Sequence, residues 1–85
     1  MKVKENYISK RVLDNDIVMD ITGNKKSLLK LNETAAFMFD RLKKGISFDD
    51  LVHAVTENYD IDIDDASKDI NEFVNKLKEL DVLDD

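Results

Sequence analysis

The first third of the sequence alternates between apolar and polar positions over short segments. Ile17, Met19 and Ile21 occupy every second position, the spacing of a β-strand with one buried face. Turn-forming residues stand on either side, at Asp14-Asn15 and at Thr22-Gly23-Asn24-Lys25. The pattern predicts a three-stranded antiparallel sheet, with strands over residues 8–13, 17–21 and 27–31.

From Asn32 onward the apolar residues recur with helical spacing. Asn32 is a good N-cap, Glu33 complements the helix dipole in the first turn, and Gly45 predicts the helix end. Ser47-Phe48-Asp49-Asp50 resembles a capping box and opens a second helix that runs to about Tyr59. The third and longest apolar stripe consists of Ala66, Ile70, Phe73, Val74, Leu77 and Leu80. The predicted fold class is therefore α+β, with three strands followed by three helices.

Composition narrows the functions open to the chain. Its 85 residues, 42% hydrophobic and 38% charged, suit one domain over residues 1–85 with a modest core. With no cysteine and only His53 as histidine, the sequence excludes thiol nucleophiles, disulfides and His-rich metal sites. The two glycines, Gly23 and Gly45, lie too far apart for a phosphate-binding loop. We therefore expect a protein that is not an enzyme and needs no cofactor.

The sequence also shows no membrane-spanning segment and no signal peptide. No apolar run approaches the roughly 18 residues needed to cross a bilayer. Residues 1–10 lack the apolar segment of a signal peptide. We expect a cytoplasmic protein that makes no membrane contact.

The acidic segment from Asp60 to Asp65 has the alternating oxygens of a calcium loop. Asp65 stands where such a loop needs glycine, and Asn71 stands where it needs glutamate. Negative charge at the N-terminus of the third helix explains these acids better, because the helix dipole favours it there.

The net charge of −6 is unevenly distributed. Residues 1–48 hold ten Lys or Arg and six Asp or Glu, a net of +4, whereas residues 49–85 hold three Lys and thirteen Asp or Glu, a net of −10. Because affinity for DNA or RNA rests on clustered cations, the acidic half argues against nucleic-acid binding. The asymmetry marks either a binding surface or a solvated face.

The remaining candidate is a groove between the third strand and the third helix. An exposed sheet edge can accept an added strand from a peptide. Leu28 or Leu29 would line the strand side, with Leu29 and Leu31 on one face and Leu28 and Lys30 on the other. On the helix side, core packing is the better interpretation of Ile70, Val74 and Leu77, and both interpretations stay open for Leu28 and Phe73.

Three short motifs stand in order along the chain. Gly23 precedes a strand that ends in Leu31-Asn32-Glu33-Thr34-Ala35, Glu57-Asn58-Tyr59-Asp60 follows at the end of the second helix, and Asp69, Phe73 and Leu77 are spaced four residues apart on the third. In this order they resemble the "LN-E-T-A" junction, the "E-x-Y-D" exit and the "D-x-x-x-F-x-x-x-L" helix of the PqqD family, the small leader-peptide recognition domains of ribosomal peptide natural-product pathways. The chain departs from the family at Phe37-Met38-Phe39, where tryptophan is frequent, and at Asp81, where glycine is common.

This resemblance implies a winged-helix-like domain that binds the leader segment of a precursor peptide as an added strand. The bound leader would be presented to a modifying enzyme, such as a radical S-adenosylmethionine enzyme, or to a leader peptidase of a lasso-peptide pathway. The peptide-binding residues implied by the resemblance lie on the third strand and the third helix: Lys26, Ser27, Leu28, Leu29, Lys30, Ala66, Asp69, Ile70 and Phe73.

Two alternatives remain beside this hypothesis. The first is a winged-helix protein that binds nucleic acid, which would need a basic recognition helix; residues 60–72 are instead rich in acids, with Lys68 as the one lysine. The second is a generic protein-interaction adaptor. Free strand edges allow either a monomer or a homodimer.

Overall fold

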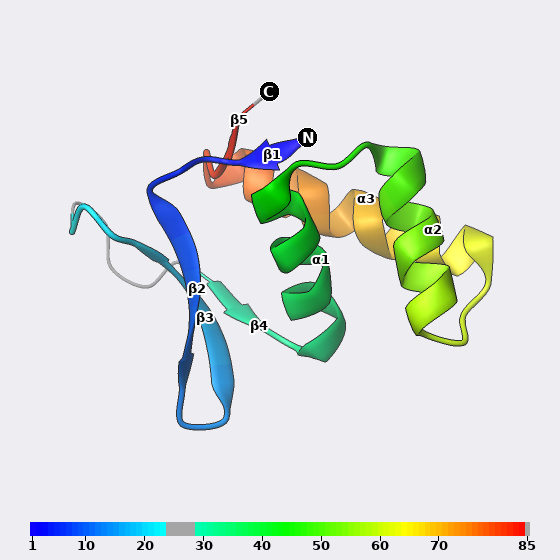
Figure 1. Ribbon diagram of the computed structural model, residues 1–85, viewed down its shortest axis with the longest axis horizontal. Coiled ribbons are helices and arrows are strands. Elements are labelled where there is room, and N and C mark those ends of the chain that lie inside the picture. The colour runs from blue at the N-terminus through cyan, green and yellow to red at the C-terminus, as the bar shows by residue number, and fades with distance from the viewer. Residues whose placement is uncertain (24–28, 85) are drawn as a thin grey trace.

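The computed structural model of the protein describes residues 1–23 and 29–84. A three-stranded antiparallel sheet has the order β2-β3-β4, with β2 at Tyr7–Val12, β3 at Asn15–Asp20 and β4 at Leu29–Leu31. Three helices follow: α1 (Glu33–Lys44), α2 (Phe48–Asn58) and α3 (Ile63–Glu79). Figure 1 shows the helices on one side of the β2–β3 hairpin. The predicted α+β class, three strands followed by three helices, is confirmed.

The helix caps read from the sequence are present. The Asn32 side chain accepts a hydrogen bond from the Ala35 N–H at 2.8 Å, and Ser47 Oγ accepts one from the Asp50 N–H at 3.1 Å. These bonds satisfy backbone donors that would otherwise lack a partner in the first helical turn. They fix where α1 starts after β4 and where α2 starts after the Gly45 turn.

The buried face of β3 is the opposite of the one predicted. Val18 is fully buried and Asp20 is nearly so, whereas Ile17 and Met19 are half-buried and Ile21 is 61% exposed. Asp20 is tolerated inside because its Oδ1 accepts hydrogen bonds from Thr22 N, Thr22 Oγ1 and Asn6 Nδ2. The more apolar set of positions therefore lies on the outer face of the sheet.

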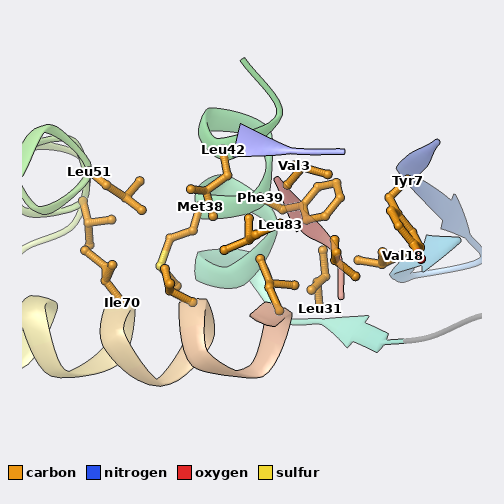
Figure 2. Packing of buried hydrophobic residues seen from close by; sticks show 14 of the residues in the cluster. Val3, Tyr7, Val18, Leu31, Met38, Phe39, Leu42, Leu51, Ile70 and Leu83 are labelled. Carbon is orange, nitrogen blue, oxygen red and sulfur yellow. The ribbon is translucent and has the colours of Figure 1, made fainter. Parts of the chain in front are cut away.

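The core lies between the sheet and the helices. Figure 2 shows Val18 and Leu31 of the sheet, Phe39 and Leu42 of α1, and Ile70 of α3 directed into it. Burial is complete for side chains from every layer, including Val18, Phe39, Leu42, Leu51, Ile70 and Leu77. No helix in residues 1–23 or 29–84 is long and apolar enough to cross a bilayer.

A second, two-stranded sheet that the sequence did not predict joins β1 (Lys2–Val3) to β5 (Leu83–Asp84). The two strands run antiparallel beside the end of α3, close to both labelled chain ends (Figure 1). The Lys4 ammonium donates to Asp81 Oδ1 at 2.9 Å, and this hydrogen bond raises the pKa of Lys4 above its usual value. Val3, Val82 and Leu83 are buried here, so the pairing extends the core past the third helix.

Helix α3 ends in a Schellman motif with aspartate in the position usually taken by glycine. The Val82 N–H donates to the Leu77 carbonyl at 2.9 Å, and the Asp81 N–H donates to the Lys78 carbonyl at 3.0 Å. Asp81 has φ 59°, a left-handed conformation that aspartate tolerates better than most residues. The departure from the family pattern at this position therefore leaves the helix end intact.

The β2–β3 turn consists of Leu13 and Asp14, one residue earlier than the predicted Asp14-Asn15, since Asn15 already pairs with Val12. Leu13 has φ 59° and is 89% exposed, so its side chain gains little from packing while its backbone is strained. Leu13→Gly is expected to raise the free energy of unfolding by about 0.5–1 kcal/mol. Urea denaturation measures the change, with Leu13→Ala as the control that removes the side chain but keeps the β-carbon. A less stable glycine variant would contradict the assignment of strain to this residue.

Candidate functional site

Strand β4 lies at one edge of the three-stranded sheet. It pairs with β3 through Asp16↔Leu31, Ile17↔Lys30 and Val18↔Leu29. In the part of the chain that the structure describes, no strand pairs with its other side. Backbone N–H and C=O groups on such an edge can pair with an added strand.

The opposite edge, on β2, is partly occupied. The Lys43 ammonium, from the last turn of α1, donates to the carbonyl oxygens of Lys4, Glu5 and Tyr7. Tyr7 begins β2, so these bonds place a cation at the start of that strand. Charged side chains beside an edge disfavour the approach of another strand. Of the two edges, β4 is therefore the more open to pairing.

A surface hollow of about 480 Å³ begins where β4 ends. It lies between the start of α1 and one face of α3, and the segment joining α2 to α3 also lines it. The lining residues are Asn32, Thr34, Ala35, Met38, Tyr59, Ile61, Asp69, Glu72 and Phe73. Asn32 directly follows Leu31, so the hollow lies next to the end of β4. We call it the α1–α3 hollow.

Aromatic contacts hold one wall of the α1–α3 hollow. The Tyr59 ring packs edge-to-face on Phe37, with ring centroids 5.5 Å apart and an interplanar angle of 88°. The guanidinium of Arg41 lies 4.4 Å from the centroid of the same Phe37 ring. Phe37 of α1 thereby holds the Tyr59 ring in place at the wall of the hollow. In the Phe37-Met38-Phe39 segment, Phe37 therefore supports the wall through Tyr59, Met38 lines the hollow and Phe39 lies in the core.

A second hollow, of about 700 Å³, lies on the hairpin side of β4. Its lining mixes both charge signs: Arg11, Asp14, Asn15, Asp16, Lys30, Leu31, Asn32, Glu33 and Ala36. Arg11 and Asp16 already form an ion pair at 3.1 Å. This hollow therefore carries little unbalanced charge, in contrast to the α1–α3 hollow, whose described lining contains two acids and no cation.

The structure separates the nine predicted site residues into four groups. Lys26, Ser27 and Leu28 lie outside the described residues. Leu29 is half-buried against the core, and Lys30 is exposed on the outer face of the sheet, as the predicted alternation requires. Asp69 and Phe73 line the α1–α3 hollow.

Ala66 and Ile70 form the fourth group, because both side chains are fully buried. Ile70 points from α3 into the core (Figure 2). Their side chains support the helix from beneath, and the face of α3 that meets the hollow is instead formed by Asp69, Glu72 and Phe73.

Sequence reasoning did not assign the other residues of the hollow. Asn32, Thr34 and Ala35 come from the start of α1, and Tyr59 and Ile61 come from the α2–α3 segment. The signal for them was present in the two motifs Asn32-Glu33-Thr34-Ala35 and Glu57-Asn58-Tyr59-Asp60, which were interpreted as a helix cap and a helix exit. Both motifs converge on one hollow. Within the described residues, no three His, Cys, Asp or Glu side chains are grouped so that they could hold a metal ion.

A comparison with models of known protein families shows to which family the chain belongs. The family model described as "Coenzyme PQQ synthesis protein D (PqqD)" matches residues 17–83. The chain belongs to the PqqD family. The match covers most of β3, all of β4, all three helices and every residue that lines the α1–α3 hollow, and it begins after β2.

Two solved structures resemble this PqqD-family chain over almost its whole length. "TbiB1 in Complex with the TbiA(beta) Leader Peptide" matches with a TM-score of 0.80 and 18% sequence identity, over 99% of this chain and 95% of that one. "Lasso peptide synthetase B1 complexed with the leader peptide" matches with a TM-score of 0.73 and 27% identity, over 92% and 89% of the two chains. The first likeness shows a shared fold. A search of curated proteins finds no match to the sequence.

Proposed function

We propose that this chain, acting as a single recognition domain over residues 1–85, binds the leader segment of a ribosomally synthesised precursor peptide. The leader adds as a strand to the free edge of β4. The bound leader is then presented to a modifying or leader-cleaving enzyme. The chain itself catalyses no reaction. The observation that carries this proposal is the β4 edge, which pairs with no further strand among the described residues and ends next to the α1–α3 hollow. Two proteins of the same fold, described as leader-peptide complexes, support it.

Strand addition fits the chemistry of this edge. The backbone of an extended peptide supplies N–H and C=O groups at the spacing that β4 presents, so its affinity comes largely from main-chain hydrogen bonds. Alternate side chains of the added strand then face opposite sides of the sheet. One set meets Leu29, Leu31 and the helix layer, and the other lies next to Lys30 on the outer face.

The enzyme that receives the leader is proposed from the relatives. The structure described as a lasso peptide synthetase B1 favours a leader peptidase of a lasso-type pathway, and the PqqD family also supports a radical S-adenosylmethionine enzyme. Nucleic acid is disfavoured as a partner, because both charged residues of α3 that line the hollow, Asp69 and Glu72, are acids.

Nuclear magnetic resonance titration tests the proposed function. The isotopically labelled chain is titrated with the leader segment of the precursor encoded in the same gene cluster. We expect chemical-shift changes concentrated in residues 26–30 and 66–77, with binding at micromolar concentrations. A scrambled peptide of the same composition is the control. Absence of binding, or shifts scattered over α2 and the β1–β5 pair, would argue against a leader-binding role.

Lys30→Glu is expected to weaken leader binding by up to about tenfold, because an exposed ion pair contributes about 1 kcal/mol or less. Lys10→Glu is the matched control. Both lysines pair with Ile17 in the sheet register and are exposed on its outer face, but Lys10 belongs to β2, away from the β4 edge. Fluorescence anisotropy with labelled leader measures both variants. Equal affinities for the two would remove Lys30 from the site.

A further inference from the structure

The α1–α3 hollow has apolar walls and an acidic rim. Its walls are formed by the side chains of Ala35, Met38, Tyr59, Ile61 and Phe73. Asp69 and Glu72 stand three residues apart on α3, so both carboxylates lie on the same side of the helix. Both residues are exposed, whereas Phe73 beside them is half-buried. The hollow therefore offers apolar surface below and two negative charges above.

The negative charge of the rim is not balanced within the described part of the molecule. Among the residues that the structure describes, no Lys, Arg or His lines the hollow. No ion pair joins Asp69 or Glu72 to a cation among residues 1–23 and 29–84; the pairs there join other acids to lysine or arginine. A ligand that covers the rim must therefore bring its own positive charge or leave the two carboxylates poorly solvated.

The course of β4 leads an added strand to this hollow. The last residue of β4 is Leu31, and the next residue, Asn32, is part of the hollow lining. A peptide strand advances about 3.3 Å per residue and directs alternate side chains to the same face. A peptide paired along the β4 edge and continuing beyond Leu31 thus places a side chain over the α1–α3 hollow.

We infer that this position of the leader is a lysine or arginine. Either side chain combines a long aliphatic stem with a cationic end. The stem would lie against Met38 and Phe73, and the cation would reach the carboxylates of Asp69 and Glu72 through charge-assisted hydrogen bonds. This inference rests on the proposed function, since it names the side chain that the same groove selects.

Other side chains fit the hollow less well. A glutamate or aspartate would be repelled by both carboxylates. A purely apolar side chain would pack against the walls. It would, however, exclude water from the two carboxylates of the rim without replacing the hydrogen bonds that this water makes to them. A lysine or arginine packs its aliphatic stem against the apolar walls and pairs its charge with the carboxylates of the rim. The aromatic rings of Tyr59 and Phe73 would add a cation–π attraction.

A charge-swap experiment tests the inference. Each Lys and Arg of the leader from the same gene cluster is replaced by Glu in turn, and binding is measured by fluorescence anisotropy. At one position we expect a loss of tenfold or more with the unmodified chain. The double variant Asp69→Lys/Glu72→Lys should lose affinity for the unmodified leader by a similar factor and should regain at least half of the loss, on a logarithmic scale, with the Glu-substituted leader.

The control Glu57→Lys/Asp64→Lys makes the same change in net charge at two exposed acids that do not line the hollow. It should leave the affinity and the charge preference unchanged, and circular dichroism shows whether each variant is folded. Failure of the unmodified leader to bind the unmodified chain would overturn the proposed function itself. Tight binding that tolerates every Lys or Arg replacement, or a rescue equally strong in the control, would overturn the inference alone.

Discussion

Ile70→Ala is expected to lower the free energy of unfolding by about 2–5 kcal/mol, the cost of removing a large buried aliphatic side chain and leaving a cavity. Ile70 is fully buried, and it packs within a core that also contains Leu51 and Leu77. Because domains of this kind are stable by only about 5–15 kcal/mol, the loss is a large part of the total. Urea denaturation followed by helical circular dichroism measures it.

The matched control for Ile70→Ala is Asp69→Ala, the adjacent residue on α3 with an exposed side chain. Asp69→Ala should change the unfolding free energy by less than about 0.5 kcal/mol, as most surface substitutions do. Once corrected for the unfolded fraction, the leader affinity of Ile70→Ala should equal that of the unmodified chain. A fully stable Ile70→Ala with weakened binding would instead make Ile70 a contact residue.

Phe73→Ala is expected to produce the largest specific loss of leader binding, by at least tenfold. Phe73 lines the α1–α3 hollow while one side of its ring packs against the core. Aromatic side chains in this position carry a large share of the binding energy at interfaces, commonly 2 kcal/mol or more. Because the ring is only half-buried, the substitution should cost about 1–2 kcal/mol of stability, less than for a fully buried phenylalanine.

Leu80→Ala separates lost contact from lost stability in the Phe73 experiment. Leu80 is also half-buried against the core at the end of α3, but it does not line the hollow. Its replacement should reduce stability by a comparable amount and leave leader affinity unchanged. If the two variants lose binding equally, destabilisation of α3 explains the effect and Phe73 has no direct role.

The sequence predicted the elements better than the faces they present. Helix starts were recognisable because Asn32 and Ser47 cap through short-range hydrogen bonds that depend only on neighbouring residues. The buried face of β3 was predicted wrongly, because counting apolar residues favours Ile17 and Met19. The face with Val18 and Asp20 can lie inside because the Asp20 carboxylate accepts local hydrogen bonds from Thr22 and a longer-range one from Asn6.

The pairing of β1 with β5 illustrates a second limit. Two residues on each side give no detectable alternation, and the partners lie about eighty positions apart in the chain. Their register, Lys2↔Asp84 and Val3↔Leu83, follows from where α3 ends and from the Schellman turn at Asp81. Such contacts depend on the assembled fold and leave no local pattern in the sequence.

The candidate site was predictable in part. The alternation of Leu29, Lys30 and Leu31 correctly assigned the faces of the edge strand. Both Ile70 and Phe73 belong to the helical stripe; core packing was the preferred interpretation of Ile70 and is confirmed, whereas the interpretation of Phe73 stayed open until the structure placed it at the hollow. An apolar stripe that covers a third of the helix circumference includes residues at the centre of the core and residues at its border. Which residues are which depends on how the neighbouring helices pack.

Amide hydrogen exchange at Leu29, Lys30 and Leu31, with and without saturating leader peptide, tests strand addition most directly. Successive N–H groups of a strand point to opposite sides, so at least one of these three faces the free edge. We predict that at least one of them exchanges markedly more slowly in the complex, while amides on the free side of β2 keep their rates. A leader that binds tightly without slowing any of the three β4 amides would contradict binding by strand addition.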